Sequence, residues 1–370
     1  MRQKLNEIQG IFLNNKWFFR VGLAACCLAF FVIVLGAYVR LSDAGLGCPD
    51  WPGCFGQLTA PDEAHEITQA VNAYPHLEVH SGKAWKEMIH RYFASILGLL
   101  ILIMAFLAWQ HRKEENQQLI LPLALVALVI FQGMLGMWTV TQLVRPTIVT
   151  LHLLTGLLTL SLLLWVSIKH HQLWIDKISQ IELNRYFKPL AKVALITLCF
   201  QIFLGGWTST NYVALYCPDF PTCQGVWLPE LNFSEAFVFF KDPTVNYEGG
   251  SLSTVAGVTV HFLHRLGAVI TTIAIATLAI LMLFKSENII LRKLAILLLV
   301  LLTVQVSLGI ANVELVLPIP VAVSHNAGAA LLLLALVLTN FSLSANKSKT
   351  TKSHYDSNND SNNDTNKATS

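Results

Sequence analysis

The chain has 370 residues, of which 54% are hydrophobic and only 13% are charged. This composition lies far outside the range of a soluble globular domain and indicates an integral membrane protein. The net charge of +3 is modest, and most basic residues lie beside apolar runs, so we predict no nucleic-acid partner.

Eight apolar runs are each long enough to cross a hydrocarbon core of about 30 Å as an α-helix. The first run lacks a small-residue cleavage site and is followed at once by an acidic loop, so we expect a retained helix rather than a cleaved signal. The fold class predicted is therefore an all-α integral membrane protein with eight transmembrane helices. In chain order, the runs centre on 20–40, 87–109, 118–140, 147–168, 190–210, 258–284, 292–313 and 320–343.

Lysine and arginine residues set the expected orientation, because basic residues near span ends are held on the cytoplasmic side. They cluster before the first run and after the second, fourth and sixth runs. Both termini are therefore predicted to be cytoplasmic, and the long acidic loops 41–86 and 212–257 are predicted to face the outside. The segment 344–370 is rich in Ser, Asn and Asp, so we predict a disordered cytoplasmic tail.

The chain contains an internal repeat. GAYVRLSDAGLGCPDWPGC at 36–54 aligns without gaps on GGWTSTNYVALYCPDFPTC at 205–223, and Gln132 and Gln305 occupy equivalent third helices. Because both halves begin on the same side of the membrane, we expect two four-helix bundles related by a pseudo-twofold axis along the membrane normal. The predicted segments are a cytoplasmic N-terminus 1–19, a first half 20–168, a cytoplasmic linker 169–189, a second half 190–343 and the tail.

Each half carries two histidines within its apolar runs. His90 and His152 are 62 residues apart, and His264 and His325 are 61 apart. Such polar residues in hydrocarbon are costly and usually mark a functional site. Two histidines on facing helices of a bundle are a known way to clamp a haem, whereas structural zinc takes four ligands. We therefore expect haem ligation near the outer surface, with His90 and His264 in the first turns of their helices.

Arg91 and Arg265 directly follow the first histidine of each half. Near the outer interface, a guanidinium is placed to pair with haem propionates. The alternative is that both side chains extend towards the lipid headgroups.

Glu87 is the clear mismatch between the two halves. EMIHR at 87–91 aligns on HFLHR at 261–265, so the second copy has His261 in place of the acid, and its ligand is assigned to His264. A glutamate at a helix start is also favoured by the helix dipole, or by pairing with adjacent basic residues. The loss of the acid in the second copy favours proton chemistry in the first half and a permanent, electron-carrying haem in the second.

Each outside loop contains a Cys-Pro-Asp-aromatic-Pro-x-Cys motif. Disulfides persist in such loops where the compartment is oxidising. Four cysteines permit three pairings, and the repetition favours Cys48 with Cys54 and Cys217 with Cys223. A structural clip is the default interpretation, with a redox relay as the alternative.

At these residues the chain resembles the haem A synthase family, membrane enzymes of bacteria and mitochondria that oxidise haem O to haem A. The resemblance covers about residues 15–345 and rests on Glu-x-x-His-Arg at 87–91, the later histidines and the paired cysteines. It implies conversion of the C8 methyl of haem O to a formyl group, by successive hydroxylation and loss of water. It also implies a bacterial cytoplasmic (inner) membrane location and supply of haem A to cytochrome c oxidase.

The resemblance further implies roles for individual residues. His90 and His152 would hold substrate haem O, His264 and His325 would ligate a haem b cofactor, and Glu87 would be catalytic. The implied partners are haem O synthase (the protohaem farnesyltransferase), cytochrome c oxidase assembly factors, a quinone or other electron acceptor, and the lipid bilayer. The alternatives are a non-catalytic di-haem b cytochrome linked to quinol, or a haem carrier.

Overall fold

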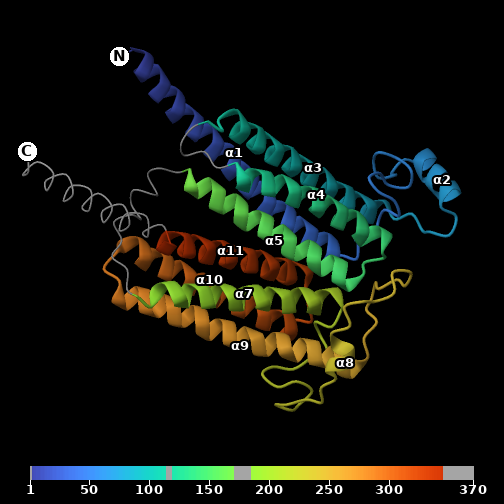
Figure 1. Ribbon diagram of the computed structural model, residues 1–370. Helices are drawn as coiled ribbons and strands as arrows, with labels where there is room; N and C mark the ends of the chain where they lie inside the picture. Colours follow the sequence, from blue (N-terminus) through green and yellow to red (C-terminus); the bar gives the residue numbers. More distant parts are fainter. Residues whose placement is uncertain (1, 114–118, 171–184, 345–370) are drawn as a thin grey trace, which may run out of the picture.

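The computed structural model describes residues 2–113, 119–170 and 185–344, and this part of the chain is helical with no strand beyond isolated bridges (Figure 1). Eight long helices are apolar enough to cross a membrane, which confirms the predicted fold class. They are α1 (Arg2–Leu41), α3 (Ser81–Gln110), α4 (Ile120–Thr141), α5 (Pro146–Lys169), α7 (Phe187–Thr210), α9 (Thr254–Lys285), α10 (Ile289–Glu314) and α11 (Ile319–Ser344).

Several helices begin before the apolar runs that predicted them. Helix α3 begins at Ser81 and α9 at Thr254, so His90 and His264 lie about three turns inside their helices and the first-turn placement was wrong. In α3 the earlier turns carry Ser81, Lys83 and Lys86, and the apolar run therefore understates the helix. At α9 the Ser253 side chain accepts a hydrogen bond from the Ala256 backbone N–H, which explains why the helix begins there.

The helices of the two halves pack in matching pairs. Helix α1 contacts α3 and α5, and α4 contacts α3 and α5; likewise α7 contacts α9 and α11, and α10 contacts α9 and α11. Between the halves, α1 contacts α11, and α5 contacts both α7 and α11. One apolar core, running from Phe18 in α1 to Leu343 in α11, includes residues of both halves. The division into two bundles about a pseudo-twofold axis stays a prediction.

The loops 42–80 and 211–253 lie at the same end of the helices, away from the first turns of α1 (Figure 1). Each contains a short helix that the sequence analysis missed, α2 (Ala64–Ala73) and α8 (Phe233–Ala236). The second loop also reaches the first half, where the Tyr247 backbone N–H donates to the carbonyl of Leu143 (N···O 3.1 Å). The loops therefore join the two halves as well as covering their ends.

The predicted tail and most of the predicted linker lie outside the described residues. The domain boundaries and the orientation of the termini stay predictions.

Candidate functional site

A large cavity opens in the first half. Its volume is about 650 Å³, and its walls come mainly from α1, α3, α4 and α5. His90 and His152 both line it, together with Glu87. Neither His264 nor His325 is among its lining residues. The structure therefore brings the two predicted ligands and the predicted acid of the first half to one space.

The second half also contributes to this cavity. Gly206, Ser209 and Thr210 of α7 and Asn326 of α11 complete the wall. Asn326 directly follows the predicted ligand His325 in the chain. The cavity is thus closed by the surface where the two halves meet.

A glycine faces each of the four histidines from a neighbouring helix. A Cβ atom added at Gly36 or at Gly205 would lie 2.9 Å from the Cε1 atom of His90 or His264, closer than carbon atoms normally approach. These two glycines occupy equivalent positions in the repeat.

The later histidine of each half has the same kind of partner. At Gly309 an added Cβ would lie 3.1 Å from His325 Cε1, and at Gly136 it would lie 3.5 Å from His152 Cε1. Each of the four imidazole rings therefore has room because the residue opposite it is a glycine, which has no side chain.

The four imidazoles are partly buried, and most of them have a ring nitrogen without a hydrogen-bond partner in the described part of the chain. In the described part of the chain, the Nδ1 atoms of His90, His152 and His325 are buried and have no hydrogen-bond partner. The exception is His264, whose Nδ1 atom lies 3.0 Å from the amide nitrogen of Gln201. Because leaving a buried polar atom unpaired is costly, the unpaired Nδ1 atoms of these three rings indicate a site built for a ligand.

These residues fit a haem better than a bare metal ion. Among the described residues, no group of three or more His, Cys, Asp or Glu side chains could hold a metal ion. A pair of imidazoles satisfies a haem iron, because the macrocycle supplies the other four ligands. The donor set of each half therefore matches bis-histidine haem ligation.

Glu87 is buried, and both of its carboxylate oxygens accept hydrogen bonds. The Cys48 backbone N–H donates to Oε2 (N···O 2.9 Å), and Arg91 Nη2 donates to Oε1 (2.6 Å). The residue has a relative exposure of 5%. The alternative of an exposed helix-start glutamate is therefore wrong, whereas the alternative of pairing with Arg91 is confirmed.

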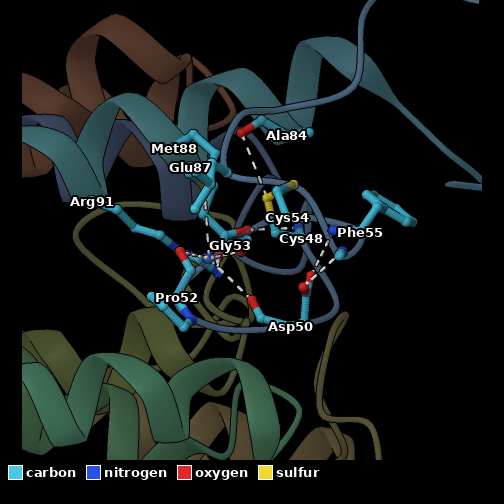
Figure 2. The surroundings of a disulfide bond; sticks show 12 residues. Cys48, Asp50, Pro52, Gly53, Cys54, Phe55, Ala84, Glu87, Met88 and Arg91 are labelled. Carbon is cyan, nitrogen blue, oxygen red and sulfur yellow. Dashed lines mark hydrogen bonds and ion pairs between the residues drawn. A yellow bond between two sulfur atoms is a disulfide. The ribbon is translucent and has the colours of Figure 1, made fainter. Parts of the chain in front are cut away.

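Arg91 ties helix α3 to the loop that contains the first disulfide. Its Nη1 atom donates to the carbonyls of Asp50, Pro52 and Gly53, and Figure 2 shows the side chain extending from the helix into this loop. The guanidinium is thus occupied by the loop and by Glu87. Pairing of Arg91 with haem propionates stays a prediction.

The second half repeats this connection with different chemistry. The Cys217 backbone N–H donates to Nδ1 of His261 (3.1 Å), as the Cys48 N–H donates to Glu87. Arg265 donates to the carbonyls of Asp219, Thr222 and Cys217. The mismatched residues, glutamate and histidine, therefore hold equivalent loops in equivalent ways.

Both predicted disulfides are present. Cys48 is bonded to Cys54, and Cys217 is bonded to Cys223. Each loop also has a cis peptide bond before its second proline, Trp51–Pro52 and Phe220–Pro221. The two disulfides confirm the predicted pairing, and the redox relay stays a prediction.

An aspartate closes each loop. Asp50 accepts hydrogen bonds from the backbone N–H groups of Phe55 and Gly56, and Asp219 accepts them from the equivalent residues of its own loop. The hydroxyl of Thr222 also donates to Asp219. This hydroxyl is the main cause that lowers the pKa of Asp219, and the backbone donors act in the same direction.

Sequence reasoning missed the role shared by Glu87 and His261. A signal was available, because both side chains can accept a hydrogen bond and both stand one helical turn before an arginine. The facing glycines were also missed, although Gly36 and Gly205 begin the aligned repeat.

Comparison with known proteins gives a consistent result. The family model described as "COX15-CtaA: Cytochrome oxidase assembly protein" matches residues 19–337. The chain is 45% identical over 269 residues to the Heme A synthase of Shewanella oneidensis, covering 72% of this chain and 78% of that protein. It is 27% identical over 302 residues to the Heme A synthase of Flavobacterium psychrophilum (74% and 81%), and 26% identical over 277 residues to that of Rhizobium meliloti (69% and 70%).

Proposed function

The chain belongs to the COX15-CtaA family of cytochrome oxidase assembly proteins, and on that premise we propose that it is a haem A synthase. It is an oxidoreductase that converts the C8 methyl of haem O to a formyl group. The reaction takes place in the first half, and the second half holds haem b. The enzyme acts in the bacterial inner membrane, with both termini cytoplasmic, and supplies haem A for cytochrome c oxidase.

The cavity of the first half carries this proposal. A volume of about 650 Å³ lies within the usual range for a site that encloses a small-molecule ligand. His90 and His152 stand in its wall as the iron ligands of haem O, with Glu87 beside them. Leu102 and Ile130 also line the cavity and are at least half exposed, and they offer an apolar exit for the isoprenoid tail of the substrate.

His264 and His325 would hold haem b in the second half. The two imidazoles come from helices α9 and α11, and each faces a glycine that leaves room for its ring. When bound, haem b supplies an iron that exchanges single electrons. The protein's part is to bury and orient the two ligands.

Glu87 serves as the proton acceptor. Converting a methyl to a formyl group is a four-electron oxidation that adds one oxygen atom to the carbon and removes two hydrogen atoms, so an acceptor must take the electrons and a base must take protons that the reaction releases. Glu87 is placed at the boundary between the cavity and the first disulfide loop. It can take a proton on the cavity side while its other contacts hold it to the loop.

Arg91 positions this acid. Its hydrogen bond to Glu87 fixes one carboxylate oxygen, and its bonds to three loop carbonyls fix the guanidinium itself. The Cys48 N–H fixes the second oxygen. A carboxylate held from both sides keeps one orientation towards the substrate, which is what proton transfer requires.

Expression of the chain in cells that make haem O tests the function. The pigments of the purified protein are extracted and separated by chromatography. The proposal predicts haem A, with haem b alongside. A haem carrier or a non-catalytic cytochrome would leave haem O unchanged, and that result would overturn the proposal.

The proposed partners follow from the same reaction. Haem O synthase, the protohaem farnesyltransferase, supplies the substrate, and cytochrome c oxidase assembly factors receive the product. A quinone or another acceptor takes the electrons.

A further inference from the structure

Arg40 is a charged side chain that the proposed mechanism does not use. Three charged side chains, Arg40, Glu87 and Arg91, line the cavity of the first half. Glu87 and Arg91 form an ion pair and neutralise each other. Arg40 forms no ion pair within the described residues, so the cavity wall has a net positive charge at this position.

Arg40 is also only partly hydrogen-bonded. Its Nη2 atom donates to the carbonyl of Ser209 (2.9 Å), and its guanidinium lies over the ring of Tyr212, with Cζ 3.9 Å from the ring centroid. Its Nε atom is buried and has no hydrogen-bond partner in the part of the chain that the structure describes. Asp43 and Glu248 interact with it electrostatically without reaching ion-pair distance. A partly buried cation with a buried, unpaired donor is costly unless an anion meets it.

The repeat restricts this cation to the first half. In the alignment of 36–54 with 205–223, Arg40 stands opposite Ser209, the residue whose carbonyl it contacts. Arg40 therefore shares with Glu87 the property of being charged in the first half and neutral in the second. Both charges lie on the cavity that we propose for the substrate.

We infer that Arg40 binds the propionate carboxylates of the substrate haem and thereby sets its orientation in the cavity. This inference rests on the proposed function for the identity of the substrate. A guanidinium is the side chain best suited to a carboxylate, because its planar donors match the two oxygens. Both Nη atoms of Arg91 already donate to Glu87 and to the loop carbonyls, so Arg40 is the cavity-lining guanidinium with fewer protein acceptors.

The orientation matters for the chemistry. On the macrocycle, the C8 methyl lies on the pyrrole ring that also carries one of the propionates. Anchoring the propionates at Arg40 therefore fixes the edge of the ring that carries the reacting methyl. Arg40 is thus a positioning residue that orients the propionate-bearing edge of the macrocycle, on which the C8 methyl lies.

The rival explanation is that Arg40 only fastens the two halves together. Its contacts with Ser209 and Tyr212, both of the second half, would serve that purpose. The two explanations differ in one respect. If Arg40 only joins the two halves, ligand affinity does not depend on the propionate carboxylates, whereas it does depend on them if Arg40 binds them.

The experiment compares haem O with its dimethyl ester, in which both carboxylates are blocked. Absorbance titrations give the affinity of each ligand for the purified wild-type protein, for Arg40→Gln and for Arg145→Gln. Arg145 is a matched control, because it also has a buried, unpaired Nε at the same end of the helices but does not line the cavity. The haem b absorbance of the second half reports whether each variant is folded.

We expect wild type and Arg145→Gln to bind the ester roughly tenfold or more weakly than haem O, and Arg40→Gln to bind both ligands alike. If Arg40→Gln still binds haem O more tightly than the dimethyl ester, the inference is overturned. So would equal binding of both ligands by wild type, a comparison that needs no variant. If the wild-type protein binds haem O more tightly than the ester but forms no haem A, the proposed function is refuted, whereas binding of the propionates by Arg40 is still supported.

Discussion

The two halves of the molecule share a scaffold and differ in a few side chains. Both have a disulfide loop held by an arginine, and both place two partly buried imidazoles opposite glycines. At the ends of the helices, the first half has Arg40 and Glu87 where the second has Ser209 and His261. On the proposed function, the comparison teaches that a duplicated frame needs few charged substitutions to turn one copy towards chemistry.

The exchange of glutamate for histidine is instructive because it preserves a contact. Glu87 and His261 each accept the backbone N–H of the first cysteine in their loop. The scaffold therefore tolerates either residue, and only the carboxylate distinguishes them chemically. This separation of structural and chemical roles makes the comparison testable by exchanging the residues.

Removing ligands should have the largest effect. We expect His264→Ala and His325→Ala each to abolish the haem b absorbance, because a haem iron held by two imidazoles loses half of its protein ligands. His152→Ala should instead lose haem O and keep haem b. Optical spectra of the purified variants measure both pigments, with His80→Ala, an exposed loop variant, as the control. Unchanged spectra in the second-half variants would refute the assignment of that half.

Exchanging Glu87 for histidine should be nearly as severe for activity. Glu87→His keeps an acceptor for the Cys48 N–H and removes the carboxylate, so haem O should still bind while haem A formation falls by about 100-fold or more. Pigment extraction over time gives the rate.

Histidine is a sharper substitution here than alanine. Glu87→Ala leaves Arg91 buried without its partner, which costs about 3–5 kcal/mol, and loss of activity would then have two explanations. The reciprocal variant His261→Glu serves as the control and should retain haem b. Full haem A yield from Glu87→His would remove the acid from the mechanism.

The glycines offer an intermediate test in both halves. In Gly36→Ala and Gly205→Ala the new methyl group would lie 2.9 Å from an imidazole carbon, so the ring must move and haem affinity should fall about tenfold, within the cost of overpacking a tight site. Titration with haem measures the affinity. Gly82→Ala, where an added Cβ meets no atom within 4 Å and which does not line the cavity, should bind as wild type does. Equal affinities in all three variants would show that the glycines do not set the site.

The disulfides should have the smallest effect. Replacing both cysteines of either pair by serine should lower the free energy of unfolding by about 2 kcal/mol, the chain-entropy contribution of so short a loop. Thermal unfolding measures this change, and pigment extraction measures conversion. A structural clip predicts that conversion continues in the Cys48–Cys54 double variant. Loss of conversion without loss of stability would favour a redox relay instead.

Much of this molecule was predictable from its sequence. Apolar length predicted eight spans, and the repeat predicted both disulfides, because each depends on local composition or spacing. The sequence predicted that His90, His152 and Glu87 belong to one site. It did not predict the cavity that they line, since its volume depends on how the helices pack. The role of Arg40 was not anticipated, because its significance comes from the contact between halves and from the occupation of Arg91 by its loop.

A density map of the protein purified from cells that make haem O tests the central claim most directly. The account predicts haem O in the first half, with its iron between His90 and His152 and Glu87 beside the macrocycle. It predicts haem b in the second half, between His264 and His325. Haem O found between the second pair, or bound away from all four imidazoles, would contradict it.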